Sequence, residues 1–300
     1  MKSFSQKTKE VMCRTEPGRL CCSMSEFFGI LMFSGKYRHN EIKASSETSI
    51  TIERFVMLLK KCFGYSAEIE ANKNTFLCTV TDEKVLKKMH SYFFRYQDGE
   101  YILKNIKEIV KNECCRGAFL RGAFLGGGII VDPNKNYNME FTIASPERAT
   151  EFNAFLTEIN LDFKRAERKG KHVLYVKNSN VICDALAYMG AFGVQMEILN
   201  IKIEKELRND VNRTVNGETA NMDKVITAAI AQIRAIEKIE KTIGLDSLSD
   251  ELCEIALLRK DNKDLSLEQL GKRLYPQLSK SGVNHRLKKI ISIAENIDKK

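Results

Sequence analysis

The stretch CCRGAFLRGAFLGGG, residues 114–128, ends in three consecutive glycines, and a similar stretch, CCSMSEFFGILMFSG, occupies residues 21–35. The two stretches align without a gap. The alignment pairs two cysteines and two glycines of each: Cys21 with Cys114, Cys22 with Cys115, Gly29 with Gly122 and Gly35 with Gly128. A repeat of this kind indicates a duplicated structural unit. The sequence therefore predicts a pseudo-symmetric fold.

Each stretch is apolar on nearly every side, which is typical of a buried helix. Gly29 and Gly122 stand inside these helices, where glycine costs about 1 kcal/mol relative to alanine. Their presence therefore predicts a close approach between the two helices. Gly35 and Gly128 stand where the helices are expected to end.

The residues after each helix predict a strand, a second helix, a β-hairpin and a closing helix. The expected ranges are 49–52, 53–63, 66–80 and 82–94 in the first repeat, and 139–143, 145–159, 163–176 and 181–189 in the second. We therefore expect one α+β domain over residues 1–205, with repeats of about 1–100 and 105–205.

A helical linker is expected over residues 206–244, because isoleucines recur at three-to-four spacing from Ile226 to Ile239. Residues 245–300 read as three helices. Ser249 is expected to cap the first, and Ser266 to Gln269 fit a capping box at the start of the second. The third begins near Ser279 or Ser281. A short second helix, a tight turn and a longer basic helix predict an all-α helix-turn-helix domain.

The net charge of +9 and the pI near 9.0 favour a polyanionic partner, nucleic acid before an anionic membrane surface. No window approaches the roughly 20 apolar residues of a membrane span, and the N-terminal residues lack the apolar run of a signal peptide. We therefore expect a cytoplasmic, nucleoid-associated chain with no membrane partner and no small-molecule substrate.

The third C-terminal helix carries the predicted DNA contacts. With Val283, Leu287 and Ile290 facing inward, its other faces hold Lys280, Ser281, Asn284, His285, Arg286, Lys288 and Lys289. Asn and Arg can form paired hydrogen bonds with base edges, and Lys and Ser suit phosphate oxygens. Residues 271–300 contain eight Lys or Arg against two acids, a local charge of +6. Double-stranded DNA is the expected partner.

Two other groups of residues are less informative. The nine cysteines form no C-x-x-C pair and have no histidine at zinc-finger spacing, so their spacing predicts neither a disulfide framework nor a metal site. A second basic cluster along the sequence, typical of a solvated surface, comprises Arg116, Arg121, Lys164, Arg165, Arg168, Lys169 and Lys171.

Two apolar helices that end in F-x-G or G-G-G and precede strands resemble the LAGLIDADG homing-endonuclease fold. The resemblance implies two helices packed at a pseudo-two-fold axis beside DNA-binding sheets, with an acid at the penultimate position of each motif to hold catalytic metal. Those positions are Ser34 and Gly127 here. Neither can replace the carboxylate oxygens that Mg²⁺ prefers. Glu26 and Asp132 are candidate substitutes, but they do not occupy equivalent repeat positions.

The departure from the motif predicts no metal, no cofactor and no nuclease activity. The paired helices, the segment 208–221 and the basic stretch 279–290 together resemble the WhiA family of sporulation and cell-division regulators. The resemblance implies a sequence-specific transcriptional regulator of cell division, chromosome segregation and, in a sporulating host, sporulation. RNA polymerase or another transcription factor is a further candidate partner. Gly217 stands where that family usually has cysteine.

Two alternatives stay open. One is a residual metal-dependent DNA-processing enzyme. The other is a protein-interaction scaffold at the nucleoid, in which the duplicated domain binds a protein and DNA binding is secondary.

Overall fold

The structure, a computed structural model, describes residues 2–297. The chain divides into two units, Met1–Lys205 and Glu206–Lys300, each with its own core. Among the described residues, no helix combines the length and the apolar character needed to span a bilayer.

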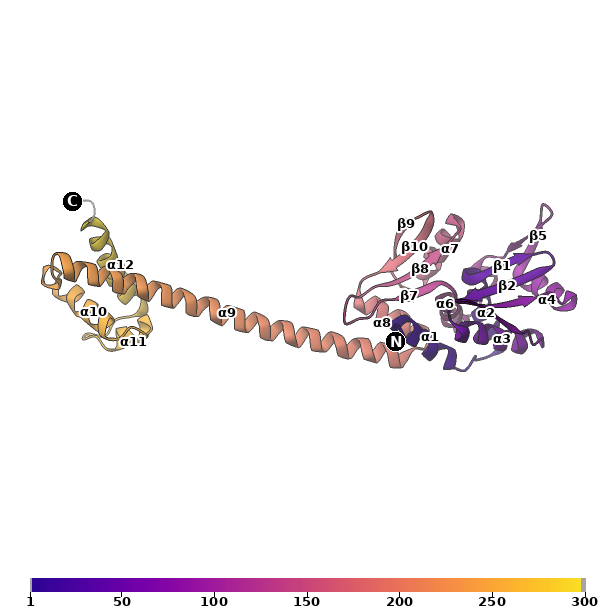
Figure 1. Cartoon of the computed structure of the whole chain (residues 1–300), viewed down its shortest axis with the longest axis horizontal. Coiled ribbons are helices and arrows are strands. Elements are labelled where there is room, and N and C mark those ends of the chain that lie inside the picture. The colour runs from indigo at the N-terminus through magenta and orange to yellow at the C-terminus, as the bar shows by residue number, and fades with distance from the viewer. Residues whose placement is uncertain (1, 298–300) are drawn as a thin grey trace. The chain divides into compact units, whose positions relative to one another are not determined.

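The first unit is an α+β domain made of two similar halves (Figure 1). The first half contains α1 (Phe4–Arg14), α2 (Leu20–Ser34), β1 (Gly35–Arg38), β2 (Glu41–Ser46), α3 (Ser49–Phe63), β3 (Ile69–Asn72), β4 (Thr75–Val80), α4 (Glu83–Phe93), β5 (Phe94–Gln97) and β6 (Glu100–Leu103). After α5 (Ile106–Ile109), the second half contains α6 (Glu113–Gly127), β7 (Gly128–Ile130), β8 (Met139–Ile143), α7 (Pro146–Glu158), β9 (Lys164–Arg168), β10 (Lys171–Val176) and α8 (Ser179–Tyr188).

The two main sheets have the same topology. Both are antiparallel and four-stranded, in the orders β1-β2-β4-β3 and β7-β8-β10-β9. In β8, Met139, Phe141 and Ile143 are buried and the two residues between them are partly exposed, as expected for a sheet with one face on the core. The predicted duplication is therefore present in the strand order itself.

Helices α2 and α6 pack against each other along the centre of this unit. A Cβ added to Gly29 would lie 2.5 Å from the carbonyl oxygen of Phe119, and one added to Gly122 would collide with that of Glu26. The glycines thus permit direct contact between the two helix backbones, as predicted. The Phe28 and Phe119 rings meet across the same contact, with centroids 5.8 Å apart.

One predicted strand is wrong. Residues 49–52 form the first turn of α3, and the strand of this half is β2. The tetrapeptide SITI is β-branched and suits a strand, but Ile52, Phe55 and Leu59 continue one buried helical face, so packing on the core decides for helix. Two further elements were not predicted from the sequence. One is α1, which begins at a complete Ser3–Gln6 capping box, and the other is the hairpin of β5 and β6.

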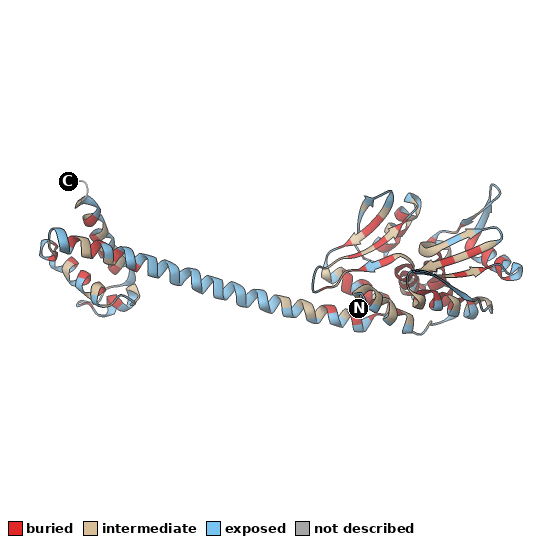
Figure 2. Ribbon diagram, in the orientation of Figure 1, coloured by how far each residue is buried: buried red, intermediate tan, exposed pale blue. Residues whose placement is uncertain are grey.

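The second unit is helical. Helix α9 (Phe192–Thr242) crosses the boundary between the units, and every residue from 206 to 228 is exposed (Figure 2). It is followed by the short 3₁₀ turn η1 (Leu245–Ser247) and by α10 (Asp250–Asp261), α11 (Leu267–Lys272) and α12 (Lys280–Ile297). The core of this unit joins the end of α9 to the last three helices and includes Ile236, Ile255, Leu270 and Leu287.

Candidate nucleic-acid interface

Helices α11 and α12 form the two arms of the helix-turn-helix. Ser266 accepts a hydrogen bond from the Gln269 amide (3.3 Å) while the Gln269 side chain accepts one from the Ser266 amide (2.9 Å), which fixes the start of α11. The turn between the helices folds back tightly because Gly271 has no side chain. A Cβ there would collide with the Leu278 carbonyl, and the Leu278 amide donates to the Gly271 carbonyl (3.0 Å).

Most of the predicted DNA-contacting side chains lie on one accessible surface of α12. Val283, Leu287 and Ile290 are fully buried, as the predicted register requires. Asn284 is half-buried, and the exposed members of the set are Lys280, Ser281, His285, Lys288 and Lys289. Ser279 accepts a hydrogen bond from the Gly282 amide (3.3 Å) and lies 2.9 Å from the Ser281 hydroxyl, so both serines sit at the start of this helix.

Arg286 is placed differently from the other members of the set. Its guanidinium forms an ion pair with Glu251 of α10 (Nη2 to Oε2, 3.0 Å), and only 18% of its side chain is exposed. The pair ties α12 to α10. This arginine therefore orients the helix, and the lysines around it remain available to an anionic partner.

A hollow lies beside the N-terminal turn of α12. It is lined by Leu267, Ser279, Lys280, Ser281 and Asn284. The first turn of a helix presents unpaired amides and a partial positive charge, which favour phosphate oxygens. In helix-turn-helix domains the N-terminal residues of the second helix reach base edges. Asn284 and the two serines occupy that position here.

The helix ends that hold metal in active homing endonucleases hold none of the required groups here. The Ser34 hydroxyl donates to the Ile30 carbonyl within its own helix (2.8 Å). Gly127 packs against the Phe33 ring, where an added Cβ would lie 2.6 Å from Cδ1. Neither position offers a charged oxygen to a cation.

Both candidate substitute carboxylates have other partners. Glu26 is fully buried between two arginines: its Oε1 accepts from Arg54 Nε (2.7 Å), and its Oε2 accepts from Arg54 Nη2 (2.9 Å) and Arg121 Nη2 (2.8 Å). Asp132 Oδ1 accepts from the amide (2.9 Å) and the side chain (3.1 Å) of Asn134, which closes a local turn. The Glu26 cluster joins the two repeats and does not face solvent.

The second basic cluster of the sequence does not form one surface. Arg121 is buried against Glu26, Arg116 pairs with Glu158 (2.8 Å), and Arg168 pairs with Glu140 (3.1 Å). The members that form no ion pair with a described residue and can contribute positive potential on β9, β10 and their turn are Lys164, Arg165, Lys169 and Lys171.

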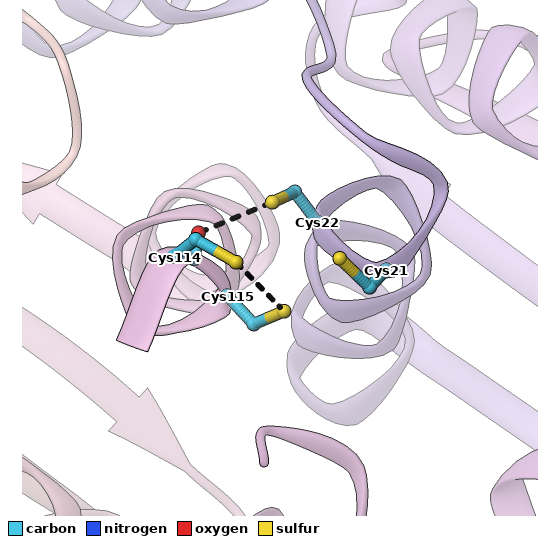
Figure 3. Close-up of side chains that lie close together, drawn as sticks. All are labelled: Cys21, Cys22, Cys114 and Cys115. Carbon is cyan, nitrogen blue, oxygen red and sulfur yellow. Dashed lines mark hydrogen bonds between the residues drawn. The ribbon is translucent and has the colours of Figure 1, made fainter. Parts of the chain in front are cut away.

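A feature that the spacing of cysteines did not predict lies at the other end of the central helices. Cys21, Cys22, Cys114 and Cys115 converge there, and their Sγ atoms all lie within 4.8 Å of one another (Figure 3). Burial raises the pKa of Cys22 to about 12. Burial also acts to raise the pKa of Cys21, but hydrogen bonds from Cys115, Cys22 and Cys114 lower it overall. The sequence feature that could have predicted this cluster is the alignment of the two repeats, which pairs the two Cys-Cys dipeptides.

A duplicated helix-sheet domain without acids at its helix ends, followed by a trihelical domain with a basic last helix, defines a helix-turn-helix protein with a degenerate LAGLIDADG-like domain. Residues 116–208 match the model of the WhiA LAGLIDADG-like domain, and residues 211–294 match that of the WhiA C-terminal HTH domain. The chain belongs to the WhiA family.

Relatives match along the whole chain. The probable cell division protein WhiA of Caldicellulosiruptor saccharolyticus is 40% identical over 99% of this chain and 96% of its own length. That of Ruminiclostridium cellulolyticum is 36% identical, over 99% and 98%. The crystal structure of full-length WhiA from T. maritima, 28% identical, superposes with a TM-score of 0.62 over 98% of this chain and 99% of that one.

Proposed function

We propose that this protein is a DNA-binding regulator of cell division that acts through α12 and does not cut DNA. The observation that carries the proposal is the accessible surface of α12, where Asn284, His285, Lys288 and Lys289 lie outside a well-packed helical core. Asn284 and His285, which can read bases, lie nearer the start of the helix than Lys288 and Lys289. This order suits base contacts followed by phosphate contacts.

The finer regulatory role rests on the family. The relatives carry the name of a cell division protein. A helix-turn-helix protein can act in cell division by binding specific DNA sequences and regulating transcription there. Chromosome segregation, and sporulation in a host that sporulates, belong to the same proposal. RNA polymerase or another transcription factor is the expected protein partner at promoters, and the nucleoid the expected location.

Loss of nuclease activity is part of the proposal because of what occupies the helix ends. Ser34 is hydrogen-bonded within its helix, Gly127 packs on a phenylalanine, and Glu26 pairs with two buried arginines. Metal-dependent cleavage needs carboxylates that hold the ion beside the scissile phosphate. The duplicated domain then serves as a scaffold or as an additional DNA-binding surface.

The test combines binding in the host and in solution. Chromatin immunoprecipitation with sequencing in the native host should enrich discrete sites, and transcripts next to them should change when the protein is depleted. Fluorescence anisotropy on those sites should show specific binding by the full chain and its loss when residues 245–300 are removed. Specific affinity that survived this truncation would favour the scaffold alternative.

A further inference from the structure

Four cysteines from the two repeats meet at the N-terminal ends of α2 and α6. Cys21 and Cys22 are the second and third residues of α2, and Cys114 and Cys115 are the second and third residues of α6. Figure 3 shows the two pairs facing each other across the contact between the helices. The duplication thus builds a cluster with equal contributions from both halves.

The spacing of the sulfur atoms suits one metal ion. Four thiolates around a tetrahedral zinc, each about 2.3 Å from the ion, lie about 3.8 Å from one another. Here the four Sγ atoms lie within 4.8 Å of one another, and those of Cys114 and Cys115 are already 3.8 Å apart. Side-chain rotations that bring the more distant sulfurs up to about 1 Å closer together would complete the shell.

Other uses of these thiols fit less well. The sulfurs of a disulfide are about 2.05 Å apart, and a bond between two adjacent residues of a helix would distort the peptide that joins them. The ligands of an iron–sulfur cluster are spread around several iron atoms, so they lie further apart than these four. A single ion is the occupant that matches the arrangement.

The surroundings contain groups that would stabilise the thiolates once an ion has displaced their protons. Neither Arg19 nor Asn112, the residues that precede the two helices, makes a side-chain capping hydrogen bond to the first turn. Both helices therefore direct the positive ends of their dipoles toward the four sulfurs, which stabilises negative charge there. The buried Ser25 hydroxyl, next to Cys115, makes no hydrogen bond of normal length to any described residue and can donate to a bound thiolate.

We propose that Cys21, Cys22, Cys114 and Cys115 bind a single thiophilic metal ion, Zn²⁺ or Cu⁺, that links the two repeats. The site lies at the end of the helix pair opposite to Ser34 and Gly127, so it has no relation to the metal positions of a nuclease. Cys114 is exposed and Cys21 is partly exposed, which gives an ion access from solvent. Binding displaces the thiol protons as the metal–sulfur bonds form, so affinity should fall as the pH is lowered.

The test uses the full-length chain, reduced with a phosphine and freed of metal with a chelator. Co²⁺ is the first probe, because four thiolates around a tetrahedral Co²⁺ give strong visible absorption. One equivalent of Co²⁺ should produce these bands and one equivalent of Zn²⁺ should remove them. Competition with coloured chelators for Zn²⁺ and for Cu⁺ then identifies the ion that is held more tightly; tight binding of either one supports the site.

Two variants separate this site from adventitious binding. Cys114→Ser changes an exposed ligand and should weaken Zn²⁺ binding by at least about 100-fold. Cys253→Ser, in the second unit, is the matched control and should leave the affinity unchanged. Circular dichroism checks that both variants are folded, and Cys21→Ser replaces Cys114→Ser if the latter is not.

Three results would overturn the proposal. The first is a wild-type protein that takes up no stoichiometric Co²⁺, Zn²⁺ or Cu⁺. The second is an affinity that Cys114→Ser and Cys253→Ser change equally. The third is a reduced protein that re-forms a disulfide among the four residues in air, shown by a mass loss of two hydrogens, and that binds no metal before it does so.

Discussion

At the scale of single residues, the first unit depends on charges that the sequence does not display as a group. Glu26, Arg54 and Arg121 come from three helices, and none of the three side chains is more than 9% exposed. Arg54 also donates to the carbonyls of Cys13 (3.0 Å) and Thr15 (2.7 Å), and Arg121 to that of Met189 (2.9 Å). The carboxylate is thus shared by two cations, each of which also donates to a backbone carbonyl of a neighbouring chain segment.

Removing the charge of Glu26 should therefore be costly. Glu26→Gln leaves two buried guanidiniums without a counter-ion, and we expect a loss of about 3 kcal/mol or more in the free energy of unfolding. Urea denaturation followed by circular dichroism measures it, with Glu16→Gln, at an exposed position, as the control. Equal midpoints for the two variants would show that the cluster contributes nothing to stability.

A partly buried lysine gives the unit a dependence on pH. Burial lowers the pKa of Lys9 to about 8, and its Nζ donates to the Leu125 carbonyl (3.2 Å) near the end of α6. The unfolded chain has the ordinary, higher lysine pKa and so binds more protons between about pH 8 and 10.4. The contribution of Lys9 to stability should rise as the pH rises through this window.

The change can be isolated with Lys9→Met. Between pH 7 and pH 10 the unfolding free energy of the wild type should rise relative to that of the variant by on the order of 2 kcal/mol. Subtracting the two titrations removes the contributions of tyrosines and thiols. A constant difference across this range would mean that Lys9 titrates normally in the folded protein.

At the scale of helices and strands, the elements with strong local signals could be predicted and those decided by packing could not. The repeat, the two apolar helices and the capping box at Ser266 are all readable along the chain. The prediction of a strand at residues 49–52 was wrong because a short β-branched run is compatible with either a strand or a helix, and tertiary contacts determine which of the two forms. The cysteine cluster and the Glu26 network join residues far apart in sequence, so no local spacing predicts them.

The contact between α2 and α6 should not tolerate a side chain. Gly122→Leu would force atoms into the backbone of Glu26, and we expect a loss of about 1 to 3 kcal/mol or more in stability. Gly193→Leu is the matched control, because a Cβ there meets nothing within 4 Å. Thermal unfolding of the full chain compares the two. A midpoint for Gly122→Leu equal to that of the control would contradict the close contact.

The residues of α12 should divide into two kinds. Asn284→Ala is expected to cost about 1 to 3 kcal/mol on the cognate site with little effect on random DNA. Lys289→Ala should weaken both about equally and reduce the slope of log K against log salt by about one unit. Salt titrations of fluorescence anisotropy on cognate and scrambled duplexes measure both effects. An equal loss on both duplexes for Asn284→Ala would show that this residue does not read bases.

At the scale of the whole molecule, the chain combines two units with different chemistry. The first has a large apolar core and a buried carboxylate paired with two arginines, and the second presents a basic helix on a small helical core. Family membership could be inferred from the sequence because its features extend along the entire chain. The proposed division of function between the units follows from what each leaves accessible.

Purified protein should accordingly leave supercoiled plasmid intact in millimolar Mg²⁺ or Mn²⁺. The helix ends lack the carboxylates that bring metal to a phosphodiester, and Asp132→Ala should change nothing in this assay. Gel electrophoresis after overnight incubation is sufficient. Site-specific double-strand breaks that vanish on chelation would require a different catalytic centre.

The glycine contact between the central helices also sets a mechanical property of the first unit. Where the two backbones touch directly, at Gly29 and Gly122, no side chain lies between them that could change rotamer, so this part of the contact acts as a stiff spacer. The sheets that follow α2 and α6 begin at Gly35 and Gly128, immediately after these helices. Their separation is therefore set by the contact between the two helix backbones more than by side-chain packing. The distance between the two sheets is therefore expected to stay constant, and a ligand that contacts both sheets must bend to fit it.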